Sequence, residues 1–314
     1  MDSEIEIGFI DHVPDETSLV CAEILKITYD LGAQIFGECL RASAPDGEDE
    51  KLVPALLLRD VCRHVMATAI LVKSGCAEPC NLTVRALYES CISLIYMLDG
   101  DTPEKAAAYR VIDALEGIKL AKKLSPFTSE GKDIRRRLRD DRLGKLDSPI
   151  FENVPDVMKD QEEILEELRK DPVREAAFLE YKRIMDSQRK GKGRRIPSWY
   201  QLFGGASSIK GLAEKTKMLY CYETFYNLAS KTAHGVNALR FAAIRQEDGT
   251  VAIPIMSSLN IEVIAVTAVN FAIISYREMI ERFCPEMGEF YNKWIIEVRR
   301  LMTKIGMGPS ASKE

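Results

Sequence analysis

The amino-acid sequence predicts an all-α protein. Apolar residues recur every three to four positions through most of the chain, which is the spacing of amphipathic helices. Residues typical of helix ends separate these segments, and one short stretch near residues 245–256 has the pattern of a strand-like hairpin. The 314 residues, of which 46% are apolar, are enough for a substantial core. We therefore expect a single domain, residues 1–314, built as a helical bundle of about six long core helices with a charged helical insertion.

The N-terminal half holds four segments of helical spacing, each next to a residue that begins or ends helices. Asp15 or Thr17 caps the first, Ser74 and Gly75 stop the second, and Asn81 caps the third. A proline opens the fourth, at a position where its missing N–H is not needed. The second and third segments form a helical hairpin because only a short turn joins them. The four expected helices span residues 17–42, 52–73, 82–99 and 103–124.

The composition changes between residues 128 and 195, where charged residues become dense and apolar residues sparse. Basic stretches flank an acidic one at residues 152–171. Helical apolar spacing persists over residues 157–168 and 176–185. We expect this charged insertion to consist of surface helices on mobile connections.

The C-terminal part returns to long apolar segments. We expect one helix over residues 213–244, a last core helix over residues 259–283 and an amphipathic helix over residues 287–305. The strand-like hairpin lies between the first two, with Asp248 and Gly249 as its turn signal.

The most apolar stretch, residues 261–276, is shorter than a bilayer-spanning helix and contains Glu262 and Asn270. It predicts a buried core helix and no association with a membrane. The chain begins MDSEIEIG, without the basic and apolar regions of a secretory signal, so we expect a cytoplasmic protein. The net charge of −5 excludes polyanion binding by bulk electrostatics and leaves only a local basic patch for that purpose.

The eight cysteines lie mostly inside apolar helical runs, where a free thiol behaves as a small hydrophobic group. Cys76 and Cys80 are the one close pair, and they lack the second pair or neighbouring histidine that a zinc site requires. We therefore expect neither a metal nor a cofactor.

A row of polar residues marks residues 222–240. At roughly 100° per residue, its members fall within about 80° of one another on a helix. A histidine acting as general acid and base on a phosphodiester is one interpretation, and a solvated helix face is the other. A serine hydrolase is disfavoured, because no G-x-S-x-G motif surrounds the serine. The members of this polar row are Glu223, Asn227, Ser230, His234 and Asn237.

Arg85 and Glu89 are spaced i,i+4 on a strongly apolar helix. An unpaired charge is heavily penalised in such a setting, so we expect the two to be buried together. One interpretation is an internal ion pair that sets helix register. The other is an arginine that Glu89 holds in place to bind an anionic group such as phosphate.

Residues 59–64 carry a third candidate. Their Arg59-x4-His64 spacing resembles the signature of the HEPN ribonucleases, the higher eukaryotes and prokaryotes nucleotide-binding superfamily. The resemblance implies that an arginine and a histidine, paired across a homodimer, attack RNA through its 2′-hydroxyl without a metal. In a regular helix Arg59 and His64 point about 140° apart, so a shared site requires the helix to begin there.

Two basic segments are candidates for contact with a phosphate backbone, and aromatic residues after the second add base-stacking surfaces. The alternative is a solvated face that pairs with the acidic stretch at residues 152–171. The candidate nucleic-acid-binding residues are Arg135, Arg136, Arg137, Lys190, Lys192, Arg194, Arg195 and Trp199.

Three segments together resemble a family of bacterial helical proteins of unknown function. They are RALYESCISLIYML at residues 85–98, Pro-Ser-Trp at residues 197–199 and YNLASKTAHG at residues 226–235. The resemblance spans roughly residues 50–285. It implies an all-α fold and that an arginine–glutamate pair and a serine–histidine pair meet in space.

We accordingly expect Arg85, Glu89, Ser230 and His234 to face one another at a polar cavity. In the leading hypothesis the protein binds or acts on RNA or a nucleotide, as a metal-independent ribonuclease-like effector in bacterial stress or phage defence. His234 is then the acid and base, and Arg85 binds phosphate. The alternative is a non-enzymatic interaction module in which the Arg85–Glu89 pair is structural.

Overall fold

The computed structural model describes residues 15–43, 48–140, 158–188, 195–227, 229–230, 244–245, 251–252 and 260–307. Nearly all of these residues are helical, which confirms the all-α class. The chain divides into two compact units, the first formed by Met1–Gly100 with Ile209–Glu314 and the second by Asp101–Ser208. The second unit encloses the charged insertion expected at residues 128–195 and begins well before it.

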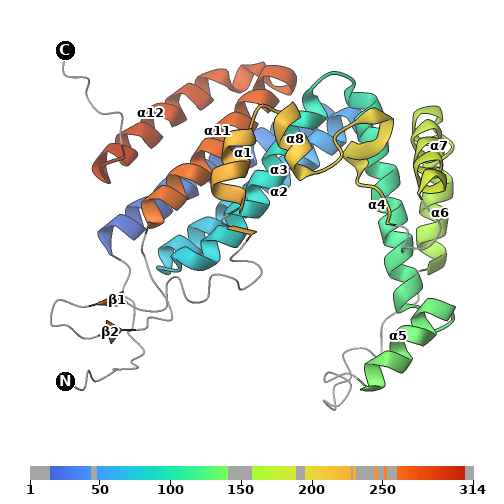
Figure 1. Ribbon diagram of the computed structural model, residues 1–314. Coiled ribbons are helices and arrows are strands. Elements are labelled where there is room, and N and C mark those ends of the chain that lie inside the picture. Colours follow the sequence, from blue (N-terminus) through green and yellow to red (C-terminus); the bar gives the residue numbers. More distant parts are fainter. Residues whose placement is uncertain are drawn as a thin grey trace. The chain divides into compact units, whose positions relative to one another are not determined.

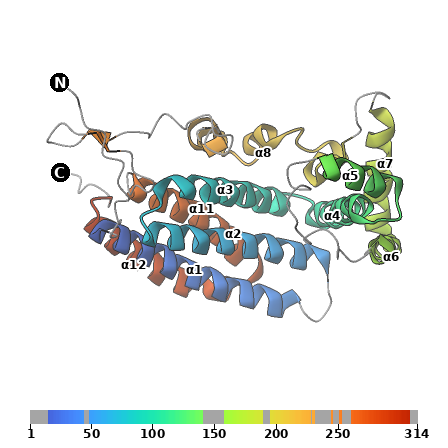
Figure 2. The same ribbon diagram turned by 90° about the horizontal axis from the view of Figure 1, so that it is seen from below.

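The first unit is built around four long helices, α1 (Glu16–Ser43), α2 (Asp49–Lys73), α3 (Ala77–Leu98) and α11 (Ile261–Phe283). Helix α11 packs against each of the other three, as Figures 1 and 2 show. A short turn, η5 (Pro285–Met287), leads into α12 (Gly288–Lys304), which lies against α1 and α11.

Buried polar contacts fix the alignment of α11 with its neighbours. The Tyr276 hydroxyl donates to the carbonyl of Thr28 on α1 at 3.0 Å, and the Cys91 thiol on α3 donates to the carbonyl of Phe271 at 3.5 Å. Tyr276, Cys91 and Thr28 are fully buried. Because an unpaired buried hydroxyl is costly, these bonds favour one register of the bundle over its alternatives.

Helix α11 is longer than the apolar run that predicted it. At 23 residues the whole helix is long and apolar enough, by length and composition alone, to cross a membrane, so the short length of the apolar run does not by itself argue against it. More than half of its most apolar window is buried against the rest of the first unit. A core helix of a soluble protein has the same length, composition and burial.

Local signals place several helix ends correctly. The Asp15 carboxylate accepts the Ser18 N–H at 2.7 Å, and Gly75 has a left-handed φ of 68° after α2. The Cys76 N–H donates to the carbonyl of Leu71, which completes a Schellman motif. The expected cap at Asn81 was wrong, because α3 begins at Ala77 and takes Pro79 into its first turn, where a proline is tolerated.

The helix expected at residues 213–244 is interrupted. The described residues form α8 (Ile209–Lys215), α9 (Leu219–Cys221) and the π-helical turn η4 (Tyr222–Tyr226). Lys217 lies between α8 and α9 with a φ of 58°, and the Met218 N–H donates to the carbonyl of Ala213 at 2.8 Å. This is a Schellman stop with lysine in the place that glycine usually occupies.

The second unit packs three helices and a 3₁₀ segment together. Helix α4 (Thr102–Leu124) contacts α6 (Met158–Leu168), α7 (Pro172–Ser187) and η3 (Trp199–Gly204). Helix α5 (Ser129–Asp140) also packs against α4. The expectation of about six core helices in one bundle was therefore wrong, because α4 belongs to this unit. Its buried core consists of Ala107, Ala108, Val111, Ile112, Ala177, Phe178 and Leu202.

Two short strands, β1 (Ile244–Arg245) and β2 (Val251–Ala252), pair in antiparallel fashion. Ile244 is opposite Ala252, and Arg245 is opposite Val251. The rest of the hairpin expected at residues 245–256 lies outside the described residues.

Candidate functional site

The i,i+4 pair on α3 forms as its spacing predicts. The Nε atom of Arg85 lies 3.2 Å from Oε1 of Glu89. The Arg85 side chain is 23% exposed and the Glu89 side chain 37%, so the expected burial of the pair is only partial. The pair is half-buried, which lets solvent or a ligand reach it.

Tyr226 completes this pair from a different part of the chain. The Nη2 atom of Arg85 donates to the Tyr226 hydroxyl at 3.1 Å, and the guanidinium carbon lies 4.8 Å from the centre of the ring. Tyr226 is itself buried, with 9% of its surface exposed. Because it ends η4, this hydrogen bond joins α3 to the segment that carries the polar row.

Burial raises the pKa of the Tyr226 phenol, and the negative charge of Glu89 raises it further. The hydrogen bond from Arg85 acts in the opposite direction, and a hydrogen bond with Glu89 again raises the pKa. The phenol therefore keeps its proton at neutral pH. Arg85, Glu89 and Tyr226 form a closed group in which each side chain contacts the other two, and we call it the Arg85 triad.

Aromatic packing holds Tyr226 in this position. Its ring centre lies 5.7 Å from that of Tyr88 on α3 and 5.0 Å from that of Tyr222, whose ring is nearly parallel to it. The Tyr88 hydroxyl donates to the carbonyl of Met218 at 3.1 Å, which ties α3 to the residue before α9. The wide turn of η4 therefore sits on α3 through three tyrosines, and turns of this π-helical type are frequent at functional sites.

Sequence reasoning missed Tyr226 as a site residue. It lies four positions before Ser230, at the edge of the polar row, and its apolar ring hides it from a search for polar side chains. If tyrosines had been placed on the helix together with the polar residues, Tyr226 would have fallen on the same face as the polar row.

The rest of the polar row is only partly described. Glu223 is exposed, and it pairs with Nζ of Lys210 at 2.8 Å and accepts from Nδ2 of Asn227 at 3.2 Å. Ser230 is helical and half-buried. His234 and Asn237 lie outside the described residues. The meeting of Arg85 and Glu89 with Ser230 and His234 stays a prediction, and the residue that reaches Arg85 is one turn earlier.

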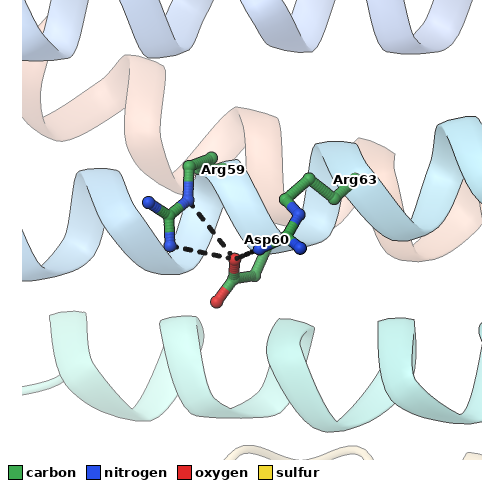
Figure 3. A network of polar contacts seen from close by, with 3 residues as sticks. All are labelled: Arg59, Asp60 and Arg63. Carbon is green, nitrogen blue, oxygen red and sulfur yellow. Dashed lines mark hydrogen bonds and ion pairs between the residues drawn. The ribbon is translucent and has the colours of Figure 1, made fainter. Parts of the chain in front are cut away.

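The Arg59-x4-His64 candidate does not form a shared site within one chain. Helix α2 begins at Asp49, so both residues lie in its middle, where they point in different directions. Oδ1 of Asp60 instead accepts from Nη2 of Arg59 and Nη1 of Arg63, each at 3.3 Å. Figure 3 shows both arginines turned toward this carboxylate along α2.

His64, on α2, is influenced electrostatically by one member of the Arg85 triad, Glu89. It is half-buried, and burial lowers the pKa of its imidazole. The charge of Asp60 raises that pKa, Arg63 lowers it and Glu89 raises it. Glu89 on α3 is thus within electrostatic reach of His64 on α2. Two candidates that are separate in the sequence therefore lie on two helices that pack against each other, α2 and α3.

The described basic residues of the second unit differ in their availability. Nη2 of Arg135 donates to the carbonyl of Leu124 at 3.3 Å, at the end of α4. Arg136 and Arg137 are exposed and pair with Asp133 on their own helix. Their expected pairing with the acidic stretch, part of which lies outside the described residues, stays a prediction. Arg195 is exposed, whereas Lys190, Lys192 and Arg194 lie outside the described residues.

Trp199 has a packing role. Its ring centre lies 5.7 Å from that of Tyr109 on α4, in an edge-on arrangement, and the side chain packs against the core of the second unit. The ring is thus largely occupied by intramolecular contacts. The expected role of Trp199 as a base-stacking surface stays a prediction.

The close cysteine pair uses its thiols for backbone contacts. The Cys80 thiol donates to the carbonyl of Cys76 at 3.1 Å, and the Cys76 thiol donates to the carbonyl of Ser74 at 3.6 Å. Among the described residues, no three histidine, cysteine, aspartate or glutamate side chains are grouped to hold a metal ion.

A family model, described as a family of unknown function (DUF5677), matches residues 51–250, which is more than half of the chain. The chain belongs to this family. A search of the curated proteins and a search of the solved structures each found no match. The matched region of this DUF5677 protein contains most of α2 and all of α3 and η4, and with them the whole Arg85 triad and His64. Membership agrees with the expected family of unknown function and assigns no activity.

Proposed function

We propose that this DUF5677 protein binds a phosphate-bearing ligand, RNA or a nucleotide, at Arg85. The observation that carries the proposal is the orientation of its guanidinium. Glu89 holds Nε and Tyr226 holds Nη2, whereas Nη1 makes no hydrogen bond to any described residue. A fixed guanidinium with free N–H groups is suited to a phosphate oxygen.

The surrounding residues supply the rest of the proposed site. Glu89 orients Arg85, and Ser230 and His234 follow Tyr226 in the sequence by four and eight residues. With His234 as acid and base, the site would cleave RNA through its 2′-hydroxyl without a metal. This is the chemistry of a HEPN-like ribonuclease, and we place it in the cytoplasm of a bacterium under stress or phage attack. Arg136 and Arg137, exposed on α5 of the second unit, are separate candidates for contact with the phosphates of RNA.

A second candidate function is non-enzymatic. The Arg85–Tyr226 hydrogen bond joins two segments far apart in sequence, and Tyr226 is nearly buried. In that case the Arg85 triad exists to hold η4 on α3, and the protein is a helical interaction module. The two functions differ in what Arg85 contributes. In the phosphate-binding protein it contributes ligand affinity, and in the interaction module it contributes stability alone.

Binding of single-stranded RNA and of 5′-AMP, measured by fluorescence anisotropy and calorimetry in EDTA, tests the proposal. Loss of a charge-assisted contact in Arg85→Gln should weaken binding about tenfold or more. Arg300→Gln is the matched control, because it removes the same charge from an exposed ion pair on α12. Equal binding by wild type and both variants would refute the anion site and favour the interaction module.

Cleavage is measured separately. In EDTA the wild type should cleave single-stranded RNA, and His234→Ala should not, while both bind it equally. Cleavage that survives His234→Ala but is abolished by His64→Ala would transfer the role of acid and base to His64. The HEPN-like version then requires a homodimer, which sedimentation velocity detects.

A further inference from the structure

Two cysteines far apart in the sequence meet inside the first unit. Cys39 lies in the last turns of α1, and Cys284 directly follows α11. Their Sγ atoms are 3.8 Å apart, close enough for one thiol to donate a hydrogen bond to the other. Cys39 is 2% exposed and Cys284 1%. Neither residue belongs to the Arg85 triad or to the polar row.

We propose that Cys39 and Cys284 are a redox modification site, which a peroxide-class oxidant converts into a disulfide. A disulfide requires an S–S separation of about 2.05 Å, so the sulfur atoms must approach by roughly 1.8 Å. Rotation of the two side chains is the movement that would bring the sulfur atoms together. The bond would tie the end of α1 to the end of α11, next to η5.

The hydrogen bond makes the two thiols unequal. It lowers the pKa of Cys284, whereas the same bond and burial raise the pKa of Cys39. Cys284 is therefore the thiol that more readily loses its proton, and the thiolate is the reactive form. Cys39 keeps its proton and lies in position to resolve an oxidised Cys284.

The chemistry balances with hydrogen peroxide as the oxidant. The Cys284 thiolate attacks one peroxide oxygen, the O–O bond breaks, and the departing hydroxide takes up the thiol proton as water. The sulfur of Cys39 then attacks the sulfenic sulfur of Cys284, and the S–O bond breaks as the S–S bond forms. The second hydroxide leaves with the Cys39 proton as water. Two thiols and one peroxide thus give one disulfide and two waters.

Other buried cysteines of the bundle have different neighbours. The Cys62 thiol lies 3.9 Å from the hydroxyl of Tyr276, and the Cys91 thiol donates to the carbonyl of Phe271. These contacts are to oxygen atoms, which cannot form a disulfide. Cys91→Ser is accordingly a matched control for the loss of a buried thiol.

The full-length protein, folded and reduced, is exposed to hydrogen peroxide. It is then denatured, alkylated and digested, and the peptides are identified by mass spectrometry. We expect one cross-linked species that joins Cys39 to Cys284, in the wild type and in Cys91→Ser. Because the pair is buried, the bond should form more slowly than the half-buried Cys76 is oxidised.

A second readout, the melting temperature, can be measured on the wild type alone. Closing so long a loop restricts the unfolded chain, so the oxidised wild type should melt roughly 5 °C or more above the reduced form. Dithiothreitol should reverse the shift, and Cys39→Ser and Cys284→Ser should show none. The proposal is overturned if the cross-link joins other cysteines, or if both thiols are still alkylated after a peroxide exposure many times longer than the one that fully oxidises Cys76. If either serine variant does not fold, the peptide map and melting shift of the wild type decide alone.

Discussion

Arg85 and Tyr226 lie 141 residues apart in the sequence, and Nη2 of the first donates to the hydroxyl of the second at 3.1 Å. Through this bond the charged side chain of Arg85, on α3, is joined to η4. It gives Tyr226 two roles, because it restrains the Arg85 guanidinium and holds the start of the polar-row segment on α3.

Replacement of Tyr226 by phenylalanine should therefore destabilise the first unit. The variant keeps the ring and removes the oxygen that accepts from Arg85, and a hydrogen bond to a charged group contributes about 1.5–3 kcal/mol. We expect the free energy of unfolding, measured by urea denaturation, to fall by that amount. Tyr222→Phe is the control, since it changes the neighbouring ring in the same way and should cost less than about 0.5 kcal/mol. Equal losses in the two variants would contradict the special role of the Tyr226 hydroxyl.

His64 predicts a pH dependence of stability. Burial lowers its pKa in the folded state below the usual 6.5, so the unfolded chain binds a proton that the folded chain does not. The contribution of His64 is therefore present above pH 6.5 and is lost as the pH falls through and below that value. His64→Gln removes this contribution to the pH dependence, although Asp60 and Glu89 remain beside the site. Urea unfolding at about pH 7.5 and about pH 5.5 should show a smaller acid loss for the variant than for the wild type. The same loss in both proteins would assign it to other groups.

The features that sequence reasoning predicted are local ones. The stop at Gly75, the cap at Asp15 and the i,i+4 contact of Arg85 with Glu89 depend on residues within one or two turns, so their spacing is enough. Helix class follows in the same way from apolar periodicity.

The features that it missed depend on distant contacts or on an unusual residue. The electrostatic influence of Glu89 on His64 follows from how α2 packs on α3, and no spacing within either helix encodes it. Tyr226 reaches Arg85 only because η4 sits on α3. The boundary of the second unit falls at residue 101, inside a continuous run of helices, whereas the composition changes near residue 128.

The break before α9 leads to a third prediction. Lys217 is exposed and has a φ of 58°, a conformation that costs a non-glycine residue about 1 kcal/mol. Lys217→Gly should therefore raise the free energy of unfolding by up to about 1 kcal/mol. Glu214→Gly, three residues earlier in helical α8, should lower it by a similar amount because glycine is unfavourable within a helix. A loss of stability in both variants would show that the left-handed turn contributes no strain.

Two glycines of α1 provide a test of the bundle itself. A Cβ atom at Gly32 would clash with the hydroxyl of Tyr276 and lie 2.7 Å from Sγ of Cys62, so α1, α2 and α11 leave no room there. At Gly37 a Cβ atom meets nothing within 4 Å. Gly32→Ala should cost about 1–3 kcal/mol by overpacking, and Gly37→Ala should contribute roughly 0.5–1 kcal/mol through helix propensity. Opposite signs in urea unfolding are expected because the backbone change is the same and only the surroundings differ. If Gly32→Ala were neutral or stabilising, the close approach of α1 to Tyr276 would be wrong, and with it the parallel alignment of α1 and α11 that brings Cys39 to Cys284.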